Sequence, residues 1–275
     1  MPSKLLSKLY SSELFVKGEW GSERMRQLAE QLIVYRRPLN FLGRDEDDEG
    51  DDCGSGEAGA EGVSSTCGIP EETVKFIHRL PPDVGKKKAA VLVCLFYDEH
   101  DELRVLLTRR SKLLSTHSGE VAFPGGKRDE MDANNIETAL REAWEEIGLD
   151  SSLVRVVTYL EPFLSKHLLR VTPVMALVPD RSKLSLTPNK GEVDAIFDAP
   201  LRMFLKNHNH RSEERQWMGI PYVMHYFDYE TITGRYLIWG MTAAILIRCA
   251  SVIYQQCPEF ETSSEFITIT NHEPT

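Results

Sequence analysis

The sequence predicts an α/β fold, a mixed β-sheet sandwiched between helices, on three observations. Several short segments rich in apolar and β-branched residues are typical of strands. One of them, 89–97, is apolar almost throughout, which indicates a strand that is buried on both faces. Two longer segments, 136–147 and 241–255, are typical of helices and occur at separate points among the strands. Helices distributed in this way are expected to cover the faces of the sheet.

Before residue 70 the sequence predicts a helix, a linker and a second short helix. Residues 22–37 predict an amphipathic helix capped by Ser22, with an apolar side made of Met25, Leu28, Leu32 and Val34. Residues 42–69 are acidic and then rich in Gly, Ser and Glu, so they are expected to form a flexible linker. The short helix is expected at 71–78. These patterns divide the chain into an N-terminal extension (1–41), the linker (42–69), one folded domain (70–260) and a C-terminal tail (261–275).

Strands and helices are expected to alternate irregularly within the predicted domain. Three lysines, 86–88, precede the first strand and are either a solvated start of that strand or a phosphate contact. After it we expect strands at 103–108, 120–123, 154–160, 169–178 and 191–197, a helical turn at 199–204, and a hairpin of 222–229 with 235–239. The apolar helix 241–255 is expected to pack on the sheet.

The net charge of −10 is unevenly distributed along the 275 residues. The run 45–52 supplies seven of the acidic residues, and the remainder of the chain is only mildly acidic. A basic surface for nucleic acid is therefore not expected. A small anionic ligand, held by a few local basic residues, is compatible with this composition.

The five cysteines include no CxxC pair, which argues against a disulfide framework or a structural zinc site. No apolar run reaches the length of a membrane span, so no membrane partner is expected. We expect an intracellular, cytoplasmic protein. A mitochondrial location is the alternative, because Lys4 and Lys8 suit a transit peptide, although Glu13 does not. The sequence leaves the oligomeric state open.

The densest cluster of chemistry lies at 125–149, a glycine pair followed by a loop and an acidic helix. Glu142, Glu145 and Glu146 are spaced i, i+3 and i+4, so they share one face of that helix, and Arg141 can pair with Glu145. By themselves the glutamates indicate either a solvated acidic face or a site for a divalent cation, since hard cations take oxygen ligands. Gly148 is expected to end the helix.

This stretch resembles the Nudix box, G-x5-E-x7-R-E-U-x-E-E-x-G-U, where U is apolar. Gly126 and the run from Arg141 to Leu149 match it, whereas Asp132 replaces the first glutamate and one extra residue separates it from Arg141. The resemblance implies a Nudix fold, magnesium or manganese as the cofactor, and Glu142 and Glu146 as metal ligands. It also implies Glu145 as a further ligand or the general base, and Gly126 as a close backbone contact of the metal or phosphate.

The preceding residues, 106–126, resemble the coenzyme A diphosphatase branch of the same family, LLTxRS-x3-R-x3-G-x3-FPGG. Arg110, Ser111, Gly125 and Gly126 fit this pattern, whereas Ser115 stands where a second arginine is expected. Arg110 is expected to grip phosphate. The nearby basic residues Arg109, His117 and Lys112 either compensate for the missing arginine or form a solvated loop.

These resemblances imply metal-dependent hydrolysis of the diphosphate bond of coenzyme A (CoA) and its derivatives, giving phosphopantetheine and adenosine bisphosphate. A pyrophosphatase of NADH or ADP-ribose is the alternative, and a non-catalytic Nudix module is a third. Glu192 is a candidate for the metal site or the general base, or it is simply a carboxylate at the start of a strand. A small-molecule diphosphate is the only partner expected.

Overall fold

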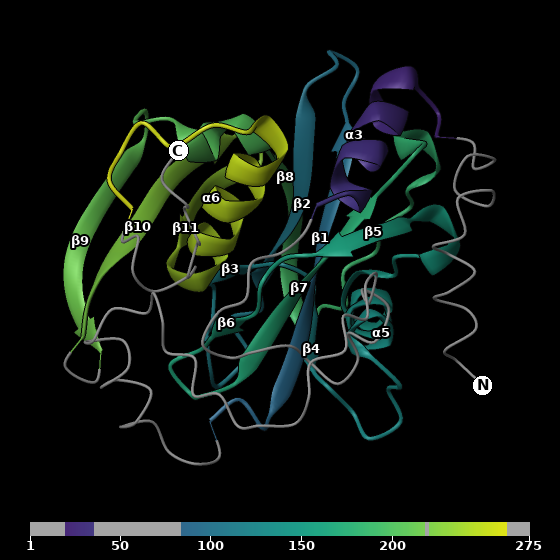
Figure 1. Ribbon diagram of the computed structural model, residues 1–275. Helices are drawn as coiled ribbons and strands as arrows, with labels where there is room; N and C mark the ends of the chain where they lie inside the picture. The colour runs from purple at the N-terminus through teal and green to yellow at the C-terminus, as the bar shows by residue number, and fades with distance from the viewer. Residues whose placement is uncertain (1–19, 36–83, 218–219, 263–275) are drawn as a thin grey trace, which may run out of the picture.

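A computed structural model describes residues 20–35, 84–217 and 220–262 (Figure 1). It contains a mixed sheet of eight strands and a second, antiparallel sheet of three. The strands are β1 (Lys88–Tyr97), β2 (Leu103–Arg110), β3 (Val121–Ala122), β4 (Gly125–Lys127), β5 (Arg155–Tyr159), β6 (Phe163–Leu164), β7 (Arg170–Leu177), β8 (Val193–Pro200), β9 (His210–Trp217), β10 (Ile220–Thr231) and β11 (Gly234–Trp239). The helices are α3 (Glu23–Ile33), α5 (Asn135–Ile147) and α6 (Gly240–Tyr254), with short 3₁₀ turns η2 (Ser151–Leu153), η3 (Arg181–Lys183) and η4 (Leu201–Leu205).

Strand β1 is the centre of the mixed sheet, whose main order is β3-β2-β1-β7-β5. It runs parallel to β7 and antiparallel to β2 at one end and to β4 at the other. Strands β6 and β8 extend the sheet through β7 and β2. The mixed sheet predicted from the sequence is therefore confirmed.

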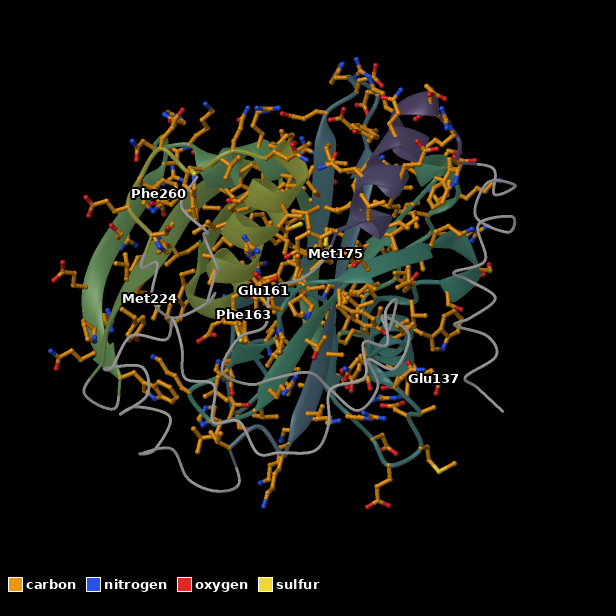
Figure 2. The ribbon with its side chains drawn as sticks, in the orientation of Figure 1. Glu137, Glu161, Phe163, Met175, Met224 and Phe260 are labelled. Atoms are coloured by element: carbon orange, nitrogen blue, oxygen red, sulfur yellow. The ribbon has the colours of Figure 1, made fainter. Side chains whose placement is uncertain are left out.

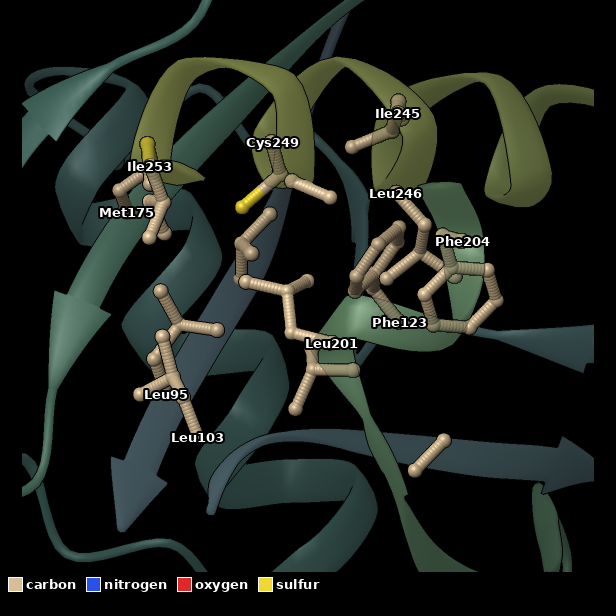
Figure 3. Packing of buried hydrophobic residues seen from close by; sticks show 14 of the residues in the cluster. Leu95, Leu103, Phe123, Met175, Leu201, Phe204, Ile245, Leu246, Cys249 and Ile253 are labelled. Atoms are coloured by element: carbon tan, nitrogen blue, oxygen red, sulfur yellow. The ribbon is translucent and has the colours of Figure 1, made fainter. Parts of the chain in front are cut away.

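Alternate side chains of β1 contribute to two separate cores, one on each face of the sheet. Leu92, Cys94 and Phe96 pack against α5, whereas Val93 and Leu95 pack against α3 and α6. Figure 3 shows the second of these cores, in which Leu246 and Cys249 of α6 face the sheet. The arrangement is the predicted sandwich of helix, sheet and helix. Helix α3 belongs to this core, although the predicted domain limits place it in an extension; those limits remain predictions.

Local sequence explains where α3 and α5 begin and end. The Ser22 hydroxyl accepts a hydrogen bond from the Met25 amide, as an N-cap does. The Asn134 side chain accepts from the Glu137 amide at 3.0 Å, and the Glu137 carboxylate accepts in return from the Ala133 amide at 2.8 Å. Gly148 ends α5 in the left-handed conformation with φ of 66°. Val34 was predicted to lie on the apolar side of this helix, which is wrong, because α3 ends at Ile33 and Val34 is 70% exposed.

A buried polar cluster joins α3 and α6 to the connection between β5 and β6. Glu161, labelled in Figure 2, is fully buried and accepts hydrogen bonds from the Arg248 guanidinium and the Tyr35 hydroxyl. Arg248 also donates to the Tyr35 hydroxyl at 3.1 Å. Burial and the Glu161 charge raise the pKa of Tyr35, so this phenol stays neutral.

Three strands were not predicted, namely β4, β6 and β9. Strands β4 and β6 have only three and two residues, too few to show a period. Strand β9 is exposed along nearly its whole length, so it lacks the alternation that reveals a half-buried strand. The predicted linker and the predicted helix 71–78 lie outside the described residues. None of the helices in the described ranges is long and apolar enough to cross a membrane.

Candidate active site

The glycine pair forms β4, which lies directly against β1 and under the acidic helix. Gly125 and Gly126 pair with Val91 and Ala90. Gly125 has φ of 150°, and a Cβ there would lie 2.4 Å from the Ala90 carbonyl oxygen, so no other residue fits without a shift of the backbone. On α5 the small side chain Ala143 is fully buried against the same sheet face. The glycines and the alanine let the helix approach the strand closely.

Glu146 is the most buried of the helix glutamates, with 4% of its surface exposed. Its Oε2 accepts a hydrogen bond from the Gly125 amide at 3.1 Å, and its Oε1 lies 3.6 Å from Nη1 of Arg110. Burial raises the pKa of Glu146 to about 7, and the charges of Glu142 and Glu192 contribute, against the opposing effects of Gly125 and Arg110. An added positive charge would therefore stabilise the ionised form of Glu146.

Glu142 lies one helical turn before Glu146 and faces Gly126. A Cβ on Gly126 would come within 2.5 Å of the Glu142 carboxylate, so the missing side chain is what admits this group. Burial raises the pKa of Glu142, with further contributions from Glu145 and Glu192 and an opposing one from Arg141. The structure therefore brings Glu142, Glu146 and the Gly126 backbone together, as the motif implies.

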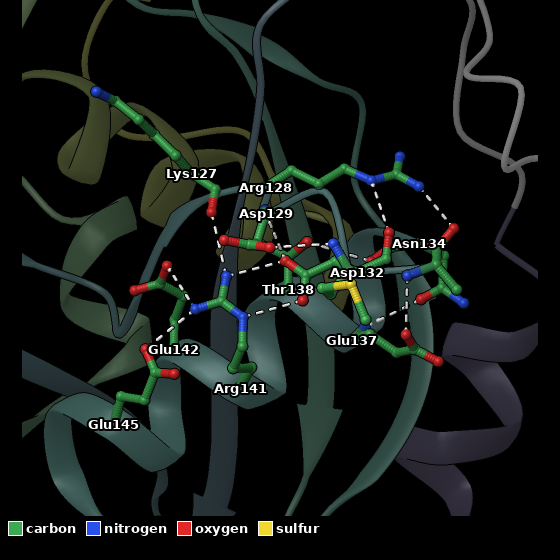
Figure 4. Close-up of polar contacts among 12 residues, drawn as sticks. Lys127, Arg128, Asp129, Asp132, Asn134, Glu137, Thr138, Arg141, Glu142 and Glu145 are labelled. Atoms are coloured by element: carbon green, nitrogen blue, oxygen red, sulfur yellow. Dashed lines mark hydrogen bonds and ion pairs between the residues drawn. The ribbon is translucent and has the colours of Figure 1, made fainter.

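Arg141 anchors the loop before the helix and restrains two glutamates (Figure 4). Its guanidinium donates two parallel hydrogen bonds of 2.9 Å to Asp132 and a third to the Lys127 carbonyl at 3.2 Å. Its Nη1 lies 3.0 Å from Glu145 and 3.1 Å from Glu142. The predicted pairing of Arg141 with Glu145 is confirmed. Arg141 lowers the pKa of Asp132 to about 2, so Asp132 serves as a permanent counter-charge.

Glu192 directly precedes β8, in a segment that lies beside α5 and β2. Its negative charge helps to raise the pKa of both Glu142 and Glu146. The backbone holds it there, since the Asn189 amide donates to the Glu146 carbonyl at 2.9 Å and the Ser111 amide donates to the Glu192 carbonyl at 2.7 Å. The segment before β8 thus lies against the end of α5 that carries Glu146, whereas half of the Glu145 side chain is exposed at the margin of the site.

Arg110 lies at the edge of this acidic region with an unused donor. Its Nη1 faces Glu146, and its Nε is buried and makes no hydrogen bond with any described residue. A buried N–H without an acceptor is costly. An acceptor oxygen from a bound phosphate would satisfy it while adding a second contact to the guanidinium.

The other upstream candidates do not all reach the acidic region. Arg109 points to the opposite face of the sheet, where its guanidinium lies 2.8 Å from Asp194 and over the ring of Tyr236. Ser111 is buried, and its hydroxyl accepts from the Leu113 amide at 3.3 Å, which shapes the loop. His117 is exposed, has a left-handed φ of 55° and bonds Glu120 at 2.9 Å.

Two tertiary partners of these residues were not identified from the sequence. His167, in the β6–β7 loop, meets His117 edge-on with ring centroids 6.0 Å apart. Asp194 is the counter-ion of Arg109. His167 lies 50 residues after His117 and belongs to no motif, so only the fold reveals this contact.

The donor set fits a hard divalent cation. Glu142, Glu146 and Glu192 offer carboxylate oxygens and Gly126 offers a backbone carbonyl, the ligand types that such cations prefer. Burial and mutual repulsion raise the pKa of Glu142 and of Glu146, and a cation would relieve both effects. Among the described residues, no three acidic, histidine or cysteine side chains lie close enough together to hold a metal ion. Water and substrate oxygens would have to supply the remaining ligands.

The α/β/α sandwich, the glycine strand and the acidic helix define a hydrolase domain of the Nudix class. The family model for the NUDIX domain matches residues 86–218. Nudix hydrolase 15, mitochondrial, of Arabidopsis thaliana is 57% identical over 70% of this chain and 70% of its own length. Nudix hydrolase 22, chloroplastic, of the same plant is 49% identical over 88% of this chain and 76% of its own length.

The chain therefore belongs to the Nudix hydrolase family, and the family prediction is confirmed. A further relative is the peroxisomal coenzyme A diphosphatase NUDT7 of Mus musculus, which is 36% identical over 72% of this chain and 89% of its own length. Members of this family act on small-molecule diphosphates and generally use divalent metals such as Mg²⁺ or Mn²⁺.

Proposed function

We propose that this Nudix hydrolase cleaves the diphosphate bond of CoA or its derivatives, with Mg²⁺ or Mn²⁺ as cofactor. The observation that carries this proposal is the placement of the Glu142 carboxylate against Gly126 and of the Glu146 carboxylate on the Gly125 amide, with the unsatisfied Nε of Arg110 at their edge. The LLTxRS and FPGG segments, and the relative named as a coenzyme A diphosphatase, support CoA as the substrate.

Each residue has a distinct role in this proposal. Glu142 and Glu146 hold the cation, with the Gly126 carbonyl and Glu145 at the margin of the site. A bound divalent cation screens the negative charge of the diphosphate and lowers the pKa of water. Arg110 uses its free donor to hold a phosphate oxygen. Either Glu145 or Glu192 accepts the proton of the attacking water.

The substrate is tested by incubating the protein with CoA and Mg²⁺ and separating the products. Phosphopantetheine and adenosine bisphosphate are expected. Turnover of NADH or ADP-ribose with none of CoA would overturn the substrate while the family assignment stands. Binding of all three without products would instead identify a non-catalytic module.

The metal site is tested with Glu146→Gln, which should abolish turnover while the protein remains folded. Glu99→Gln is the matched control, because Glu99 is exposed in the β1–β2 turn, away from the site. Separate Glu145→Gln and Glu192→Gln variants assign the base, since the base variant should lose kcat with little change in metal affinity. A fully active Glu146→Gln variant would refute its proposed role.

The relatives' names also bear on the location. Of the two expected locations, the mitochondrial one agrees with the name of the 57% identical relative, and we propose it for this chain. Imaging a tagged chain with and without residues 1–21 tests this proposal. Cytosolic signal from both forms would contradict it.

A further inference from the structure

One end of the mixed sheet is basic, although the chain as a whole carries a net charge of −10. Backbone hydrogen bonds hold three segments side by side there. The Arg128 amide donates to the Lys88 carbonyl at 3.0 Å, and the Arg170 amide donates to the Lys87 carbonyl at 2.9 Å. The Gly85 amide donates to the Leu168 carbonyl at 3.1 Å. The starts of β1 and β7 and the end of β4 therefore meet at this edge.

Four exposed lysines project from these segments, and we call them the lysine edge: Lys86, Lys87, Lys127 and Lys166. None of the four pairs with an acidic side chain within the described ranges. Other surface lysines do so, since Lys183 lies 3.4 Å from Asp180 and Lys206 forms an ion pair with Glu259. Neighbouring like charges repel one another, and a bound anion would offset this repulsion.

The lysine edge adjoins the candidate active site through β4. Gly126 faces the Glu142 carboxylate, and successive residues of a strand point to opposite faces, so Lys127 leaves the strand on the other side. The Lys127 carbonyl accepts from Arg141, whereas its side chain extends away from the Arg141 network (Figure 4). Consecutive Cα atoms are about 3.8 Å apart, so Lys127 begins next to the site without entering the acidic region.

We infer that the lysine edge binds a second phosphate group of the substrate, a phosphomonoester on its nucleotide part. The acidic region and Arg110 would hold the diphosphate that is cleaved, and the lysine edge would hold the phosphate that is retained. This inference rests on the proposed function and sharpens it, because it predicts a preference for nucleotides that carry the extra phosphate. The same contact would also hold the adenosine bisphosphate product.

The first test measures binding and needs no turnover. Calorimetry on the full chain compares adenosine bisphosphate with AMP in the wild type, in Lys127→Ala/Lys166→Ala and in the control Lys183→Ala. The wild type and the control should bind the bisphosphate about tenfold more tightly, which is about 1.4 kcal/mol. The double variant should lose this difference and bind AMP as before. Lys127→Arg/Lys166→Arg, which retains both charges, should restore it.

The second test compares kcat/KM for CoA and for CoA that lacks the ribose phosphate. The wild type should favour CoA, and the alanine double variant should treat the two alike. Equal binding of bisphosphate and AMP by the wild type, or a difference that survives in the double variant, would overturn the inference. Failure to cleave CoA would overturn only the proposed function, because the binding measurement would still decide the role of the lysine edge.

Discussion

Replacing Glu146 with Gln tests whether a buried charge is retained at the expense of stability. Glu146 is 4% exposed, and burial is the main reason why its pKa rises from the ordinary 4.5 to about 7. Gln has nearly the same shape, and its side-chain oxygen can still accept the Gly125 amide. The substitution therefore removes the charge with little change in packing.

The expected gain in stability follows from the pKa of Glu146. A folded-state pKa of about 7 in place of 4.5 corresponds to about 3 kcal/mol at full ionisation, because each pH unit is worth about 1.4 kcal/mol. The carboxyl is neutral in the folded and unfolded states below pH 4.5, so the variant gains nothing there. The gain should grow as the pH rises from 4.5 to about 7 and remain constant above it.

Urea unfolding in the presence of a chelator measures this gain directly. At pH 8 the Gln variant should be more stable by about 1–3 kcal/mol, and at pH 4.5 it should match the wild type. The exposed Glu99→Gln control should change neither value. A Gln variant that is less stable at pH 8, or a gain that is the same at both pH values, would refute the reasoning.

Three further predictions concern the charged and polar groups around the sheet. Asp132→Asn should lower the free energy of unfolding by about 1–2 kcal/mol at pH 7, because Arg141 keeps the pKa of Asp132 low. The loss should shrink as the pH falls from 3.8 towards 2, which urea unfolding at several pH values tests. Burial lowers the pKa of His225 to about 4, so the free energy of unfolding of the wild type should fall by about 2–3 kcal/mol between pH 6.5 and pH 4. It should fall less in His225→Phe, and an equal fall would contradict this assignment. Arg248→Met should cost about 3–5 kcal/mol by leaving Glu161 buried and unpaired, and adding Glu161→Gln should recover part of the melting temperature; no recovery would refute the pairing.

The acidic helix and the central strands were predictable because their signals are local. On this helix, apolar residues recur at helical spacing: Ala143 and Ile147 are fully buried, and Ile136 and Leu140 pack beside them. Gly148 ends the helix as expected. In both elements the spacing of the apolar residues matches the period of the backbone, which is a signal contained within the element itself.

The orientation of neighbouring basic residues was not predictable from the motif alone. The second strand is expected to end at Thr108, so its alternation does not cover Arg109 or Arg110: Arg110 is expected to grip phosphate, and Arg109 either to compensate for the missing arginine or to lie in a solvated loop. Strand β2 continues to Arg110, and successive strand residues point to opposite faces. Arg110 therefore faces Glu146, whereas Arg109 faces Asp194. Once the strand is known to extend that far, alternation assigns the two residues correctly.

The departure from the Nudix box at Asp132 has a geometric explanation. Aspartate is one methylene shorter than glutamate, and the loop here has one residue more between this position and Arg141. The extra residue lets the backbone bring the shorter side chain close enough for two parallel 2.9 Å hydrogen bonds to the guanidinium. The Asp129 amide donates a further hydrogen bond of 2.9 Å to Oδ2, the oxygen that also accepts from Nη2 of Arg141. The helix requires a permanently charged carboxylate facing Arg141, because Arg141 in turn restrains Glu142 and Glu145. The longer loop and the shorter side chain together preserve that carboxylate.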